Sequence, residues 1–143
     1  MLAVRQKSIE TTHQQIEEKL ELVKEWLSFM NLDEKPHQLE GIKWCLTHEL
    51  KIQPKYGIRG GFVCDEMGLG KSFLMLGCIL TNQLKNTLIV VPLALLQQWK
   101  ALIYRVFDGV ECLVYHGSSI KKLVMDDLKN SSIILTTYGM IAR

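Results

Sequence analysis

One short run of the chain combines glycines, a lysine and a serine in the order typical of loops that bind phosphates. Residues 65–72 read Asp-Glu-Met-Gly-Leu-Gly-Lys-Ser. Gly68 and Gly70 permit backbone conformations and a close approach that a Cβ atom would prevent. In such loops the backbone N–H groups surround the phosphates, the lysine supplies positive charge and the following hydroxyl binds Mg²⁺. Lys71 and Ser72 hold these two positions.

A turn that only joins a strand to a helix is the alternative interpretation of this run. Gly-Lys-Ser between a strand and a helix argues against that alternative. One position departs from the G-x4-G-K-[ST] pattern, because Asp65 stands where the pattern has glycine. The departure argues against small kinases and G proteins, and it leaves phosphate binding open.

Hydrolysis of a bound nucleotide also needs an acidic pair after an apolar strand, to hold Mg²⁺ and orient the attacking water. The chain has three adjacent acidic pairs, at residues 33–34, 65–66 and 126–127. The first lies in a linker and the second in the loop itself. The third follows apolar residues with helical spacing, which indicates an exposed helix face. We therefore expect this chain to bind nucleotide weakly at best and not to hydrolyse it.

The elements that must position the loop form an alternating pattern from Gly57 onward. Short β-rich runs at 62–64, 87–91, 111–115 and 132–137 alternate with helical spacing at 72–84, 93–106 and 118–129. Strands separated by helices in this way are typical of βαβ units and a parallel sheet. The sequence therefore predicts an α/β fold.

The first thirty residues predict a helix. Apolar residues recur on one stripe, and Thr11 with Gln14 could form a capping box at its start. The stripe consists of Ile16, Leu20, Val23, Leu27 and Met30. A short coiled coil and a helix packed on the following residues are the two interpretations. Pro36 then opens a second helix after a linker.

The composition excludes several classes of protein. The 143 residues are 48% apolar and 22% charged with a formal net charge of +2, which argues against a disordered or fibrous chain. The longest apolar stretch, residues 88–96, is far shorter than the ~20 residues of a membrane-spanning helix. The four cysteines show no metal-ligand spacing and lie in apolar patterns, which favours buried thiols in a reducing, intracellular compartment.

Residues 65–72 resemble the nucleotide-binding motif of the Swi/Snf-type remodelling ATPases, within helicase superfamily two. Four further segments are similar to motifs of that family, in the same order. They are residues 35–42, 88–93 with Trp99, 114–117 and 133–138, which read Lys-Pro-His-Gln-Leu-Glu-Gly-Ile, Leu-Ile-Val-Val-Pro-Leu, Val-Tyr-His-Gly and Ile-Ile-Leu-Thr-Thr-Tyr. The resemblance spans about residues 35–143 and leaves only the front helix outside.

The resemblance implies a P-loop, RecA-like, three-layer fold with a parallel sheet and flanking helices. It implies an N-terminal helix and linker over residues 1–34, and the first part of an ATP-binding lobe over 35–143. The family's Asp-Glu-x-His segment and its later motifs would lie beyond Arg143. The parent protein would be an ATP hydrolase that moves on duplex DNA or remodels chromatin.

The resemblance also assigns roles to residues. ATP and Mg²⁺ would be held by Asp65, Glu66, Met67, Gly68, Leu69, Gly70, Lys71 and Ser72. Lys71 and Ser72 would act in catalysis, with Ser72 as the ligand for nucleotide-bound Mg²⁺. Gln38 would read the adenine, and Pro92, Thr136 and Thr137 would hold the DNA backbone. The alternatives are an ordinary surface glutamine, a proline that ends a strand and threonines that fill a sheet.

The implied partners are ATP, duplex DNA bound weakly by this chain, and nucleosomes or other DNA-bound proteins. The front helix would contact a partner or the lobe itself, and in a eukaryotic cell the location would be the nucleus. Two other classes stay open. One is a different superfamily-two motor, such as a restriction translocase or an RNA helicase. The other is a short, non-catalytic nucleotide-binding or interaction module.

Overall fold

The structure is a computed structural model that describes residues 2–50, 55–82, 84–107 and 109–142. The chain forms two compact units that divide after Asn82. In the described residues the first unit is helical, and the second contains a three-stranded sheet with short helices.

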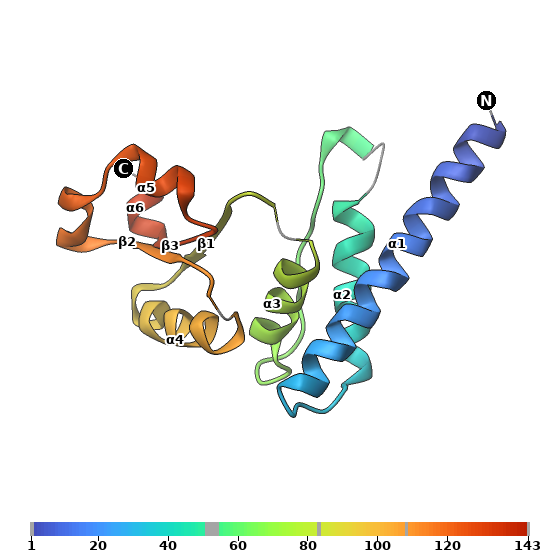
Figure 1. The fold of residues 1–143 in the computed structure, drawn as a ribbon, viewed down its shortest axis with the longest axis horizontal. Helices are drawn as coiled ribbons and strands as arrows, with labels where there is room; N and C mark the ends of the chain where they lie inside the picture. The colour runs from blue at the N-terminus through green and yellow to red at the C-terminus, as the bar shows by residue number, and fades with distance from the viewer. Residues whose placement is uncertain (1, 51–54, 83, 108, 143) are drawn as a thin grey trace. The chain divides into compact units, whose positions relative to one another are not determined.

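Three helices pack side by side in the first unit (Figure 1). They are α1 (Leu2–Phe29), α2 (Pro36–Glu49) and α3 (Lys71–Thr81), and each contacts the other two. A 3₁₀ turn, η1 (Lys55–Gly57), lies between α2 and α3 in sequence. The apolar stripe of α1 is buried over Ile16, Leu20, Val23 and Leu27. Helical spacing places these side chains on one face, and that face packs within the unit.

Two expectations about the first unit are wrong. α1 begins at Leu2, so Thr11 and Gln14 lie inside the helix, and Gln14 donates its side-chain N–H to Glu18 (3.1 Å). Residues 62–64 are not a strand, and Phe62 is 90% exposed. A strand needs a neighbour for its N–H and C=O groups, and no described strand pairs with this segment.

The second unit is built on a parallel sheet of three strands in the order β1-β3-β2. These are β1 (Thr87–Val91), β2 (Cys112–Tyr115) and β3 (Ile133–Thr137). Val91 lies opposite Thr137, and Tyr115 lies opposite Thr136, so the carboxyl ends of the strands meet at one edge. The sheet confirms the predicted α/β class.

Helices cover both faces of this sheet (Figure 1). On one face α4 (Leu96–Val106), preceded by the 3₁₀ turn η2 (Leu93–Leu95), contacts β2 and β3. Ile103 of α4 is fully buried with Ile133 and Leu135 of β3, and these side chains form the core of the unit. On the other face lie the short helices α5 (Met125–Asn130) and α6 (Tyr138–Ile141).

The predicted helix over 118–129 is instead two elements. A 3₁₀ segment, η3 (Gly117–Lys122), is followed by extended backbone at Leu123 and Val124, and α5 begins only at Met125. The carboxylate of Asp127 accepts a hydrogen bond from the N–H of Val124 (2.8 Å). A side chain that satisfies a free N–H at a helix start fixes where the helix begins, and apolar spacing does not reveal it.

Candidate functional site

The glycine-rich loop is positioned directly before α3. Gly70 precedes the first residue of α3 and has φ +81°, and Gly68 has φ +89°. Both lie in the left-handed region, which costs any residue with a Cβ atom strain. Among the described residues, no side-chain hydrogen bond caps the start of α3. The loop therefore has the backbone that a phosphate-binding turn requires.

Lys71 folds back over this loop. Its ammonium donates hydrogen bonds to the carbonyl oxygens of Asp65 and Glu66, both at 2.7 Å. The positive charge is thereby held at the Asp65–Glu66 segment of the loop. An ammonium and a set of N–H groups are the donors that phosphate oxygens accept from, so these residues fit a phosphate chain.

Gln38 lies against the same loop from the first turn of α2. Its side chain is buried, and Nε2 donates a hydrogen bond to the carbonyl oxygen of Leu69 (3.0 Å). A Cβ atom on Gly70 would overlap Nε2, so a larger residue there would also displace the Gln38 side chain. The structure thus brings Gln38 to the loop, and its reading of adenine stays a prediction.

His37 is a loop contact that the sequence analysis did not single out. Its Nε2 lies 3.2 Å from the carbonyl oxygen of Leu69, the acceptor that Gln38 also uses. A carbonyl oxygen only accepts, so Nε2 carries the hydrogen in this contact. The position of His37 next to Gln38, at the start of the same helix, is the signal that could have indicated it.

α2 packs closely on α3, the helix that directly follows the loop. A Cβ atom on Gly77 would lie 2.7 Å from Cδ1 of Ile42 and 3.8 Å from Cγ1 of Val23, so the three helices cross at this glycine. Burial raises the pKa of Cys78, and it also raises the pKa of its neighbour Cys45 on α2. Both thiols are therefore neutral members of the core.

The three residues predicted to hold DNA lie together in the second unit. Pro92 follows β1 and is exposed, whereas Thr136 and Thr137 end β3 and are buried. Thr136 Oγ1 donates to the carbonyl oxygen of Tyr115 (2.8 Å), and Thr137 Oγ1 lies 3.2 Å from His116 Nδ1. Both hydroxyls thus interact with the end of β2 or the residue after it, and DNA contact at this edge stays a prediction.

Comparison with known protein families decides the classification. Residues 37–143 match the family model described as the SNF2-related domain. The chain belongs to the SNF2-related family. The matched residues include the glycine-rich loop, Gln38 and all three described strands, and they begin after α1.

Named relatives of this SNF2-related chain are much longer proteins. An uncharacterized ATP-dependent helicase of Schizosaccharomyces pombe is 37% identical over 114 residues, which cover 74% of this chain and 10% of the relative. The DNA repair protein RAD5 of Eremothecium gossypii is 32% identical over 121 residues, which cover 59% of this chain and 11% of the relative. The chain thus spans about a tenth of the length of these relatives.

A solved structure of the same family supports the fold. The Sulfolobus solfataricus SWI2/SNF2 ATPase core in complex with dsDNA is similar with a TM-score of 0.59 and 26% identity. The match covers 78% of this chain and 22% of that structure. Together with the parallel sheet, it identifies the fold of this SNF2-related chain as part of a RecA-like lobe.

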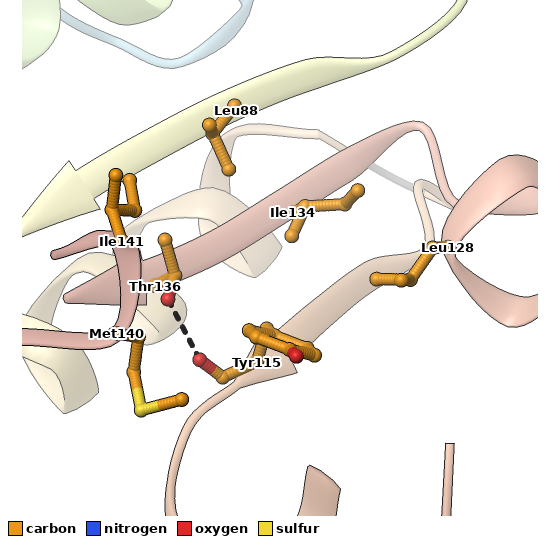
Figure 2. Close-up of a pocket in the computed structure, with 7 residues that line it drawn as sticks. All are labelled: Leu88, Tyr115, Leu128, Ile134, Thr136, Met140 and Ile141. Atoms are coloured by element: carbon orange, nitrogen blue, oxygen red, sulfur yellow. Dashed lines mark hydrogen bonds between the residues drawn. The ribbon is translucent and has the colours of Figure 1, made fainter. Parts of the chain in front are cut away.

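The second unit of this SNF2-related chain also contains an apolar hollow (Figure 2). Its volume is about 210 Å³, and its lining consists of Leu88, Tyr115, Leu128, Ile134, Thr136, Met140 and Ile141. Figure 2 shows the hydrogen bond that the Thr136 hydroxyl donates to the carbonyl oxygen of Tyr115. The hollow has no set of charged groups for a nucleotide.

The described residues contain neither a cluster of metal ligands nor a helix suited to a membrane. No group of three or more histidine, cysteine, aspartate or glutamate side chains there could hold a metal ion. In the same residues, no helix has the length and apolar character needed to cross a membrane.

Proposed function

We propose that this chain is an ATP-binding segment of a DNA-dependent ATPase that couples ATP hydrolysis to movement on duplex DNA or to chromatin remodelling. The observation that carries the proposal is the turn at the start of α3. It combines two left-handed glycines, first-turn N–H groups that no described side chain caps, and the Lys71 ammonium held at the loop. Membership of the SNF2-related family supports the same conclusion.

Different groups of the loop would bind the phosphates, the Mg²⁺ ion and the adenine. The loop backbone from Asp65 to Gly70 and the first turn of α3 would donate hydrogen bonds to phosphate oxygens. Lys71 would exchange its two carbonyl acceptors for phosphate oxygens, which carry full negative charge and are stronger acceptors. The Ser72 hydroxyl would ligate Mg²⁺, and Gln38 would hold the loop through Leu69 while its amide reads the adenine. Bound Mg²⁺ would neutralise charge on the phosphate chain.

Binding without hydrolysis is the expected behaviour of the isolated chain. The pair 126–127 lies in the first turn of α5 and not at the end of a strand, so it does not form the acidic site that hydrolysis requires. The relatives named as DNA repair proteins, and the similar core solved with dsDNA, support DNA as the partner of the parent protein. Pro92, Thr136 and Thr137 would contact its backbone, with nucleosomes as further partners and the nucleus as the location in a eukaryotic cell.

A binding titration tests the proposal. We expect the purified chain to bind a fluorescent ATP analogue in the presence of Mg²⁺, and Lys71→Ala to weaken this binding at least about tenfold, because a charged hydrogen bond to phosphate is lost. Lys85→Ala removes an exposed lysine of the second unit and serves as the matched control. Equal affinity of Lys71→Ala and the unchanged chain would overturn the proposal.

Phosphate release separates binding from catalysis. We expect no DNA-stimulated release by the chain alone. Release that DNA stimulates and Lys71→Ala abolishes would show that the chain has an acidic site of its own, and would contradict the binding-only assignment.

A further inference from the structure

α1 lies outside the residues that match the SNF2-related domain, yet it is built into the unit that carries the phosphate loop. Its buried stripe contacts both α2, which positions Gln38, and α3, which begins with Lys71 and Ser72. Val23 is completely buried and lies at the crossing point on Gly77. α1 therefore forms one core together with α2 and α3.

Two contacts place α1 along the whole length of α3. Lys19 Nζ donates a hydrogen bond to the carbonyl oxygen of Thr81, the last residue of α3. Trp26, two turns further along α1, packs on Phe73 with ring centroids 6.4 Å apart and planes tilted by 35°. Phe73 directly follows Ser72, so the Trp26 end of α1 lies beside the first turn of α3.

α1 is also tied to α2 by charge. Lys43 Nζ of α2 lies 2.5 Å from a carboxylate oxygen of Glu17, and this pair is about half exposed. An exposed pair of this kind contributes little stability. The apolar contacts of Val23 and Trp26 therefore do most of the positioning.

Trp26 has a feature that stability does not explain. It is 9% exposed, and its buried indole N–H has no hydrogen-bond partner among the described residues. A buried donor without an acceptor is destabilising, and phenylalanine would avoid that cost. What Trp26 does supply is a large ring against Phe73 at the start of the phosphate-binding helix.

We propose that α1 is a functional part of the nucleotide site and that Trp26 is a positioning residue, which acts through Phe73 to hold the first turn of α3 in its phosphate-binding conformation. The proposal rests on the proposed nucleotide binding. It adds that residues before the family match set the affinity of the loop.

The test compares the affinity for the fluorescent ATP analogue with thermal stability in four variants of the full chain. Trp26→Leu removes the ring contact, and we expect it to raise Kd about fivefold or more, the size of an ordinary coupling between sites. Trp26→Phe keeps an aromatic ring but a smaller one, and we expect a rise in Kd that is smaller than that of Trp26→Leu. Phe73→Leu removes the same contact from the α3 side and should raise Kd as Trp26→Leu does.

Leu20→Ala is the control for a merely structural effect. Leu20 is buried on the same helix, next to Lys19, whose side chain reaches the carbonyl oxygen of Thr81 at the far end of α3. Its truncation should lower the melting temperature at least as much as Trp26→Leu, and leave Kd within about twofold, because the cavity lies away from the first turn of α3.

The outcomes separate the two proposals. If the unchanged chain and Lys71→Ala bind alike, nucleotide binding at the loop is wrong. If Lys71→Ala loses binding while Trp26→Leu and Phe73→Leu keep it, or while Leu20→Ala loses as much as they do, the role of Trp26 is wrong. If Trp26→Leu does not fold, as circular dichroism would show, Phe73→Leu decides.

Discussion

At the residue scale, a Cβ atom added at Gly70 would have two separate effects. The φ of +81° at Gly70 disfavours any residue with a Cβ atom, and a Cβ atom there would also overlap Nε2 of Gln38. Gly68 has a similar φ of +89° with nothing near the added atom. The two glycines therefore separate the effect of backbone strain from the effect of the glutamine contact.

We predict that Gly68→Ala and Gly70→Ala each lower the free energy of unfolding by about 1–2 kcal/mol through strain alone. Gly70→Ala should lose more, because Gln38 must also move from Leu69. In a Gln38→Ala background the two glycine substitutions should become equal. Urea denaturation of the five variants measures these differences, and equal losses with Gln38 present would contradict the contact.

Cysteine burial makes stability depend on pH. Burial is the main cause that raises the pKa of Cys78 above its ordinary value of 9.0, so above about pH 9 the unfolded chain loses this proton while the folded chain keeps it. The free energy of unfolding must then fall as pH rises, by at most about 1.4 kcal/mol per pH unit for one thiol.

We predict that Cys78→Ala makes the decline in stability between pH 8 and pH 10.5 shallower. Cys64→Ala, which changes an exposed cysteine, is the matched control. Urea denaturation at a series of pH values provides the measurement. Parallel slopes for the two variants would show that Cys78 ionises as readily in the folded chain as in the unfolded one.

At the element scale, a helix or strand could be predicted when neighbouring residues in the sequence specify it. β1 and the ends of β2 and β3 follow from β-rich runs, and α3 follows from the Gly-Lys-Ser junction. The expected strand at 62–64 fails because pairing depends on a neighbour, which a local run of residues does not specify. Burial of Cys64 was expected with that strand, and the thiol is exposed for the same reason.

In the candidate site, too, features with a local sequence signal could be predicted and tertiary contacts could not. The residue types and spacing of the loop indicated phosphate chemistry, which stays a prediction, and Gly68 and Gly70 have left-handed φ values. The contact of His37 with Leu69 could not be predicted, because it depends on how α2 packs on the loop. A tertiary contact between residues 32 positions apart has no signature in local spacing.

The start of α5 depends on the side chain of one aspartate. Asp127 accepts the N–H of Val124 and fixes the helix start, whereas Asp126 is exposed and forms only a 3.9 Å pair with Lys129. We predict that Asp127→Ala lowers the free energy of unfolding by about 1 kcal/mol. Asp126→Ala should change it by less than about 0.5 kcal/mol. Chemical denaturation compares them, and equal effects would contradict the capping role.

At the scale of the whole molecule, the sheet has two edges among the described residues. β1 and β2 each pair only with β3, so one side of each strand has no described strand beside it. β1 (Thr87–Val91) begins with a threonine, and its other four residues are apolar. Leu88 of this strand is 57% exposed. An exposed apolar edge strand favours association with other chains.

We predict that the purified chain self-associates as its concentration rises, and that Leu88→Lys reduces the association. A lysine on an edge strand is unfavourable when two such edges approach. Gln97→Lys adds the same single positive charge at an exposed position of α4 and controls for the added charge. Sedimentation velocity measures the effect; a monomer at all concentrations would contradict the prediction.

The central claim is that the loop before α3 is a nucleotide site, and residue-resolved amide NMR tests it most directly. On addition of Mg²⁺ and ATP, we predict the largest shifts for the backbone amides of residues 66–72 and the side-chain amide of Gln38. In Lys71→Ala these shifts should be lost while the rest of the spectrum is unchanged. Shifts centred elsewhere, or the same shifts in Lys71→Ala, would contradict the account.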